Sequence, residues 1–132
     1  MSTEENKNIM QRSVGEIFNK GNYDVVYEIY DENYIGYVPP NDIKGPEEMK
    51  QFITQLRNAF PDLKITIEDQ IAEGDLVASR QTAAGTHEGD FQGIAATGKK
   101  MSITLTVILK VSILLKLISL FSILVEELHQ AA

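Results

Sequence analysis

The sequence predicts a single α+β domain in which helices come first and antiparallel strands follow. Up to residue 60, apolar side chains recur at three- and four-residue steps, which is typical of amphipathic helices. From residue 63 to residue 107 they alternate with polar ones, which is typical of strands. Helices followed by a run of strands indicate an α+β fold, and 132 residues with 43% hydrophobic side chains suit one core.

Two helices are expected before residue 31. Ser2 and Thr3 precede Glu5 in the arrangement of a capping box, so a helix begins there. Its apolar stripe stops at Gly21 and consists of Ile9, Met10, Val14, Ile17 and Phe18. After the glycine, Asp24 is placed to act as the N-cap of a short second helix.

A strand and the clearest helix of the chain come next. Residues 33–38 are rich in strand-forming side chains, and two prolines end this strand. Pro46 suits the first turn of a helix, and the two glutamates after it favour the positive end of the helix dipole. The helix therefore runs from residue 45 to residue 60, where Pro61 closes it.

Three strands are expected in the second half of the chain. The alternation from residue 63 runs on to Ile71, and Gly74 marks a turn into a returning strand over residues 76–86. Residues 88–98 contain two internal glycines and read as a loop ending at a third, and residues 101–107 alternate as one more strand.

The last quarter of the chain differs chemically from the rest. Residues 1–100 contain 17 acidic and 10 basic side chains and every Gly, Pro, Asn and Asp, whereas residues 101–132 contain 2 of each charge. Polar residues within 111–125 recur at helical steps, as in a mostly buried helix, while its β-branched residues suit a strand. Helix and strand both remain possible for this segment, and we favour a last strand.

Composition excludes several classes of function. A formal charge of −7 with scattered basic residues argues against a nucleic-acid partner. The absence of cysteine excludes thiolate chemistry, and no His/Asp/Glu cluster has metal-ligand spacing, so no metal is expected. The uncharged stretches of the tail, nine residues each, are too short for a membrane span, and the polar N-terminus predicts a cytoplasmic protein.

Three passages together resemble one known family. They are Gly-Pro-Glu-Glu at 45–48 with Phe-Pro-Asp-Leu at 60–63, Glu-Gly-Asp-Leu-Val-Ala at 73–78, and Gly-Thr-His-Glu-Gly-Asp-Phe-Gln-Gly-Ile at 85–94 followed by Thr97 and Gly98. The chain resembles the SnoaL-like polyketide cyclases and ester cyclases of the nuclear-transport-factor-two-like superfamily. The resemblance covers about 100 residues of one domain, 1–132, in which residues 111–132 are atypical.

The resemblance implies a cone: a curved, mostly antiparallel sheet packed against the N-terminal helices and enclosing an apolar pocket. It also implies a homodimer formed through the sheet, a small apolar or polyketide-like ligand, and neither metal nor cofactor. The cyclases of the family close a ring by an aldol step, in which a carboxylate of the last strand moves the proton and a polar pocket residue helps to hold the enolate. Such a carboxylate would be a usable base because an apolar cavity raises its pKa.

The sequence departs from the family pattern where this chemistry is decided. The position of the carboxylate aligns near Ser122, and the only acids of the tail are Glu126 and Glu127. The last-strand carboxylate is therefore expected to be missing. Two lesser departures are Tyr37, where relatives often have a first-strand histidine, and Gln81, where they often have a tryptophan.

His87 is the candidate catalytic residue, because it lies in the most family-like passage and imidazole exchanges protons near neutral pH. The alternative is a structural role at the strand end or in the following loop. Gln81 is expected to face the pocket in place of Arg80, since a neutral amide costs less to bury than an unpaired guanidinium. The remaining candidate pocket walls, for which ordinary core packing is the alternative, are Tyr34, Tyr37, Phe52, Leu56, Phe60 and Phe91.

Three functions stay open on this sequence. The first is cofactor-free acid–base chemistry on a small apolar molecule, with His87, Tyr37 and Gln81 as its polar groups. The second is a non-catalytic ligand-binding or dimerisation module of the same fold. The third is an isomerase- or hydrolase-like relative, which would need a buried acid before residue 91. An acid inside the pocket would separate the second function from the other two.

Overall fold

The computed structural model describes residues 2–38, 41–111 and 116–119 and has the predicted α+β architecture. Its helical elements are α1 (Thr3–Arg12), the π-helix η1 (Ser13–Asn19), α2 (Asp24–Ile29) and α3 (Gly45–Ala59). Its strands are β1 (Ile35–Val38), β2 (Asn41–Lys44), β3 (Lys64–Glu73), β4 (Leu76–Thr86), β5 (Lys100–Lys110) and β6 (Lys116–Ser119).

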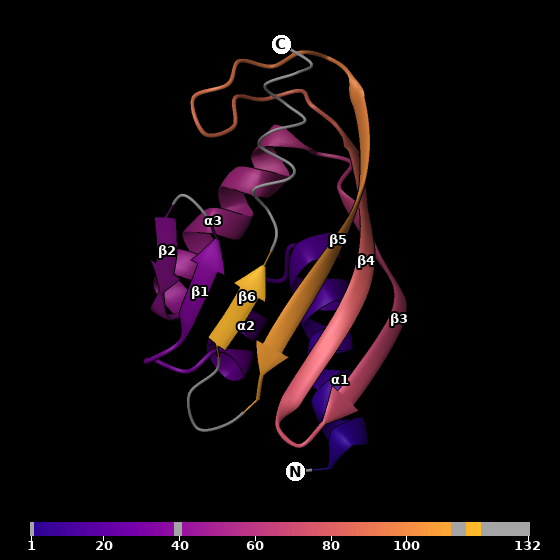
Figure 1. The fold of residues 1–132 in the computed structure, drawn as a ribbon. Coiled ribbons are helices and arrows are strands. Elements are labelled where there is room, and N and C mark those ends of the chain that lie inside the picture. Colours follow the sequence, from indigo (N-terminus) through magenta and orange to yellow (C-terminus); the bar gives the residue numbers. More distant parts are fainter. Residues whose placement is uncertain (1, 39–40, 112–115, 120–132) are drawn as a thin grey trace.

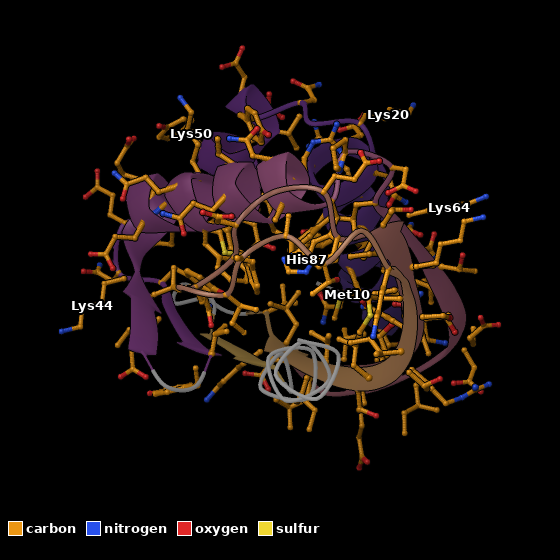
Figure 2. The ribbon with its side chains drawn as sticks, turned by 90° about the horizontal axis from the view of Figure 1, so that it is seen from above. Met10, Lys20, Lys44, Lys50, Lys64 and His87 are labelled. Atoms are coloured by element: carbon orange, nitrogen blue, oxygen red, sulfur yellow. The ribbon has the colours of Figure 1, made fainter. Side chains whose placement is uncertain are left out.

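The six strands form one curved sheet in the order β2-β1-β6-β5-β4-β3. All neighbours are antiparallel except β1 and β6, which run parallel. The long strands β3, β4 and β5 bend together in Figure 1. Seen from above, the sheet curves around one side of the molecule while α3 and the N-terminal helices close the other (Figure 2). The core therefore lies between the helices and the concave face of the sheet.

The N-terminal helix begins as the sequence predicts. The Ser2 hydroxyl accepts a hydrogen bond from the Glu5 backbone at 3.1 Å, and the Glu5 side chain accepts one from the Ser2 backbone at 3.4 Å. The predicted cap of α2 is wrong. Asp24 is the first helical residue, and the preceding residue makes no side-chain cap. Backbone hydrogen bonds to carbonyls at positions 22 and 23 satisfy the first turn instead.

The first helix changes from α to π geometry at Ser13 and ends against α3. The Arg57 side chain of α3 donates to the backbone carbonyls of Phe18 and Asn19 at 2.7 and 2.9 Å. These carbonyls lie at the C-terminus of η1, where no further helical turn is present to donate N–H groups to them. Gly21 follows with φ of +71°, and a Cβ there would lie 2.7 Å from Nε of Arg57.

Two features of the sheet differ from the predictions. The short strand β2 was not expected. The prolines at 39–40, which lie outside the described residues, were interpreted only as the end of the preceding strand. In β3 the register shifts between Ile67 and Asp69, so the predicted alternation breaks. This irregularity turns Ile71 outward, and its side chain is 74% exposed.

The tail contains a strand where its structure is described. Lys116–Ser119 forms β6, which lies between β1 and β5, so a strand is confirmed for these four residues. Residues 112–115 and 120–125, the rest of the segment for which strand and helix were both open, lie outside the described residues. So do Ser122, Glu126 and Glu127.

Candidate functional site

His87 lies directly after β4 and is fully buried, with 0% of its surface exposed. Its ring stacks on Phe60 at 5.3 Å between centroids with an angle of 22°. Phe60 in turn meets Phe91 edge to face at 6.0 Å. Figure 2 shows His87 in the interior enclosed by the helices and the curved sheet. Three of the predicted site residues are thus brought together.

Hydrogen bonds to Thr97 determine which nitrogen of His87 carries the proton. The Thr97 backbone N–H donates to Nδ1 at 3.3 Å, and the Thr97 hydroxyl lies 3.1 Å from the same atom. A backbone N–H can only donate, so Nδ1 is the acceptor and the neutral ring carries its proton on Nε2. Nε2 is buried and has no hydrogen-bond partner among the described residues. His87 therefore presents a fixed, unused donor.

The backbone of the loop that follows β4 holds this geometry. Hydrogen bonds of 3.0 and 2.8 Å link His87 to Lys99 and Gly98, so the two ends of the loop meet. The N–H groups of residues 88 and 89 donate to the carbonyl of Ala59 at the end of α3. Gly89 is required at this contact, because a Cβ there would lie 2.7 Å from the carbonyl oxygen of Asn58.

Gln81 faces the interior, as predicted. Its side chain is 3% exposed, and its amide nitrogen lies 3.2 Å from the Ser79 hydroxyl and 3.7 Å from Sδ of Met10. Arg80 lies on the opposite face of β4, where it pairs with Asp69 at 3.0 Å. The alternation of the strand thus places the amide inside and the guanidinium in solvent.

A cavity of about 20 Å³ adjoins Gln81, between the first helix and the sheet. The hydroxyls of Ser13 and Tyr30 lie 2.6 Å apart at its wall, and burial raises the pKa of Tyr30 to about 12. The volume suits roughly one water molecule. The lining residues are Met10, Ser13, Val14, Phe18, Tyr30, Ile65, Gln81 and Val107.

Tyr34 supplies a second buried polar atom without a partner. The side chain is 0% exposed, and its hydroxyl has no hydrogen bond among the described residues. Burial raises the pKa of this phenol well above its usual value, with a smaller contribution from Tyr30, which it meets edge to face at 4.7 Å. A Cβ at Gly36 would lie 2.7 Å from the hydroxyl oxygen, so the glycine makes room for it.

Of the three remaining residues predicted to line the pocket, two lie in the interior and one does not. Phe52 and Leu56 lie on the buried face of α3, at 8% and 0% exposure. Tyr37 is 37% exposed, and its neighbours in β1, Gly36 and Val38, are buried. The alternation of β1 therefore turns Tyr37 away from the interior, and the structure does not bring it together with the other candidates.

Buried acids are absent from the described part of the chain. Every Asp and Glu there is exposed or half-buried, and the buried polar residues are Asn6, Ser13, Ser79, Gln81 and His87. The described residues also contain no group of three or more side chains arranged to hold a metal ion. None of their helices is long and apolar enough to cross a membrane.

Sequence reasoning missed the residues that orient the candidates. Thr97, which fixes the His87 ring, was recognised only as part of the family-like passage. Its position ten residues after His87, at the far end of a glycine-containing loop, was the available signal. Met10 was recognised only as part of the apolar helix stripe and Ser13 was not singled out, because nothing local indicates which buried side chains meet Gln81.

Comparisons with known proteins agree on the fold and the family. The model of the SnoaL-like polyketide cyclase family matches residues 8–112. No curated protein matches the chain in sequence. TsrD from Streptomyces laurentii is similar in structure, with a TM-score of 0.81 at 22% identity, covering 97% of this chain and 97% of that chain.

Two further solved structures show the same fold. A protein from Jannaschia Sp. CCS1, named as SnoaL-like polyketide cyclase, is similar with a TM-score of 0.81 at 20% identity, covering 93% of this chain and 90% of that chain. AclR from Streptomyces galilaeus is similar with a TM-score of 0.78 at 24% identity, covering 98% of each. With the family match over residues 8–112, these findings lead to one conclusion: the chain belongs to the SnoaL-like polyketide cyclase family.

Proposed function

We propose that the chain binds a small, largely apolar, polyketide-like molecule in the interior of the cone and donates a hydrogen bond from His87 to its carbonyl oxygen. The observation that carries the proposal is the Nε2–H of His87, which is fully buried and has no partner among the described residues. Leaving a buried donor unsatisfied costs about 1–3 kcal/mol, so a ligand that supplies an acceptor recovers this energy.

The surroundings of His87 support a ligand contact at this point. Thr97 fixes the ring through Nδ1, and Phe60 stacks on its face, so the donor is oriented before any ligand arrives. A donor held in place in an interior shielded from water stabilises negative charge on an oxygen more effectively than a mobile one does. The phenol of Tyr34, equally buried and without a hydrogen-bond partner in the described part of the chain, is a second candidate donor.

Aldol ring closure is the reaction that this arrangement would serve. A base removes a proton from a carbon beside one carbonyl, and the resulting enolate carbon attacks a second carbonyl of the same molecule. A carbon–carbon bond forms, and the new alkoxide takes up a proton, so no oxidation or reduction occurs. Nε2–H of His87 would hold the enolate oxygen, while the proton transfer requires a base such as a carboxylate.

A non-catalytic binding module is the second candidate. It is favoured by the positions of the described acids, all of which are exposed or half-buried and none of which lies inside the core. Without a base in contact with the ligand, the same interior would bind a ketone without converting it. The isomerase- or hydrolase-like alternative needs a buried acid before residue 91, and none of the acids at the described positions there is buried.

The experiment compares the bicyclic ketone 1-tetralone with tetralin, the same hydrocarbon without its oxygen. Binding to the full chain is followed by NMR titration. We expect wild type to prefer the ketone by about tenfold at most, in keeping with one net hydrogen bond, and His87→Phe to lose that preference. Phenylalanine retains a ring against Phe60, so packing is matched while the donor is removed. Equal binding of the two compounds to wild type would contradict the proposal.

A second arm separates catalysis from binding alone. Intramolecular aldol condensation converts 2,6-heptanedione to 3-methylcyclohex-2-enone, whose formation is followed by its ultraviolet absorbance. Turnover by wild type that is lost in His87→Phe supports a cyclase function. Ketone-selective binding without turnover supports the non-catalytic module.

We also propose that two copies associate through the outer face of the sheet. Ile71, Ala78 and Ile108 form one cross-strand row on that face, at the end of the sheet near the β3–β4 turn. Ile71 is 74% exposed, and Leu76 beside this row is 46% exposed. A second copy that covers this row would remove apolar surface from water, as the resemblance to sheet-mediated dimers implies.

A further inference from the structure

A groove of about 380 Å³ opens at the end of the sheet where β4 finishes. Ala84 lies in it, four positions along β4 from the exposed Arg80, so the groove lies on the outer face of the sheet and Gln81 on the inner one. It is therefore separate from the interior site and at the opposite end of this face from the apolar row. The lining residues are Asp62, Lys64, Ala84, Gly85, Thr86, Lys100, Met101 and Ser102.

The strand register places two lysines on either side of a floor of small residues. Lys64 of β3 pairs with Ala84 of β4, which pairs with Ser102 of β5. Lys100 lies in the adjacent row, opposite Thr86. Because neighbouring strands are about 4.8 Å apart and the two rows are two residues apart along the strands, the backbone positions of the two lysines are roughly 12 Å apart. Two flexible ammonium groups can converge over that span on one anionic group.

Neither lysine is neutralised by an ion pair within the described residues. Among the described residues, Asp62 is the one carboxylate that lines the groove, and its two oxygens accept hydrogen bonds from the backbone and hydroxyl of Thr86 at 2.7 and 2.8 Å. These hydrogen bonds, and to a lesser extent the charge of Lys100, hold the pKa of Asp62 below its usual value. The described lining of the groove thus carries two positive charges and one negative charge, in a chain of net charge −7.

We propose that this groove binds a small anion, with its carboxylate or phosphate group held between Lys64 and Lys100 and hydrogen-bonded by the hydroxyl of Ser102. Lysine acts toward such groups as a compact point charge with three donors. Free phosphate and the charged end of an organic molecule share this chemistry. Ala84 and the half-buried Met101 give the groove apolar surface that would favour the organic anion.

The test is an amide NMR titration of the isotope-labelled full chain at constant ionic strength. The probes are inorganic phosphate, benzoate and the uncharged benzamide. We expect saturable shifts confined to residues 84–86 and 100–102 with the two anions. Lys64→Gln and Lys100→Gln should each weaken binding about three- to fivefold, and the double variant about tenfold or more, the scale of exposed charge interactions.

Lys44→Gln is the matched control. Lys44 is also an exposed lysine of the sheet, at the end of β2, but it lies on the other side of the molecule from Lys64 (Figure 2). Its loss should leave the affinity for both anions unchanged. Shifts that do not saturate, equal weakening by Lys44→Gln, or benzamide binding as tightly as benzoate would overturn the proposal. His87→Phe should bind both anions as wild type does, which keeps this test independent of the interior site.

Discussion

His87 and Tyr34 illustrate how single residues acquire a role from neighbours that are distant in sequence. The histidine is a donor at Nε2 because Thr97 occupies Nδ1. The tyrosine hydroxyl is accommodated because Gly36 has no side chain. In both cases the polar atom is buried and has no partner among the described residues, a state that is uncommon in protein cores. This distinguishes the two residues from Phe52 and Leu56, whose side chains are apolar and need no hydrogen-bond partner when buried.

The contact between Tyr34 and Gly36 gives a prediction with an internal control. Gly36→Ala would place a Cβ 2.7 Å from the Tyr34 hydroxyl oxygen. We expect the free energy of unfolding, measured with urea, to fall by about 1–3 kcal/mol, as for other overpacked sites. Tyr34→Phe removes the oxygen and should restore most of this loss in the double variant. If the double variant is no more stable than Gly36→Ala, the contact is not the cause.

At the scale of elements, the N-terminal helices are fixed to α3 by a side chain that crosses between them. Arg57 donates to two carbonyls at the end of η1, which have no partner inside their own helix. A π-helix widens the turn, and such segments are often found beside functional sites. Here η1 carries Val14 and Phe18 to the wall of the cavity next to Gln81.

We expect Arg57→Met to lower the free energy of unfolding by about 1–3 kcal/mol, since it removes two charge-assisted hydrogen bonds from half-buried carbonyls. The amides of residues 20–22 should exchange faster with solvent in this variant. Arg80→Met is the control, because the Arg80–Asp69 pair is exposed on both sides and should contribute less than about 1 kcal/mol. Equal losses in the two variants would contradict the capping role of Arg57.

The elements predicted from sequence are those that local chemistry determines. The capping box at Ser2, the helix with Pro46 in its first turn and the turn at Gly74 each combine a start or stop signal with a clear period, and all three were found. The inward side of Gln81 followed from alternation, which allows only one of Arg80 and Gln81 inside, and from the lower cost of burying an amide. The break in β3 was not predictable, because Ile71 continues the apolar pattern and only the pairing with β4 moves it outward.

The candidate site was predictable only in part, for a related reason. His87 and the aromatic residues around it lie in passages whose composition identifies them. Its tautomer depends on Thr97, and the pocket-facing side of β1 depends on which strands flank it. Tyr37 and Gly36 cannot be told apart as outer and inner residues from a strand of four residues alone. Tertiary neighbours supply that information, and one sequence does not contain it locally.

For the whole molecule, the proposed dimer predicts a defined change in mass. Size-exclusion chromatography with light scattering should give twice the mass of 14.7 kDa for wild type. Ile71→Lys with Leu76→Lys should give a monomer, because the charges would be desolvated against the partner copy. Gln55→Lys, on the exposed side of α3, serves as the control and should remain dimeric. A monomeric wild type, or a lysine variant that still dimerises, would contradict the proposed interface.

The position of β6 has a consequence for the order in which the strands pair during folding. The strand β1 pairs with β2, which follows it closely, and with β6, which comes some 80 residues later. On the ribosome, the β1–β2 hairpin can form early, yet it joins the larger sheet only after Lys116–Ser119 has emerged. Pairings of such long sequence separation slow folding. Until β6 has been synthesised, the edge of β1 that faces away from β2 therefore has no β6 to pair with. The pairing of β6 with β1 and β5 then completes the sheet.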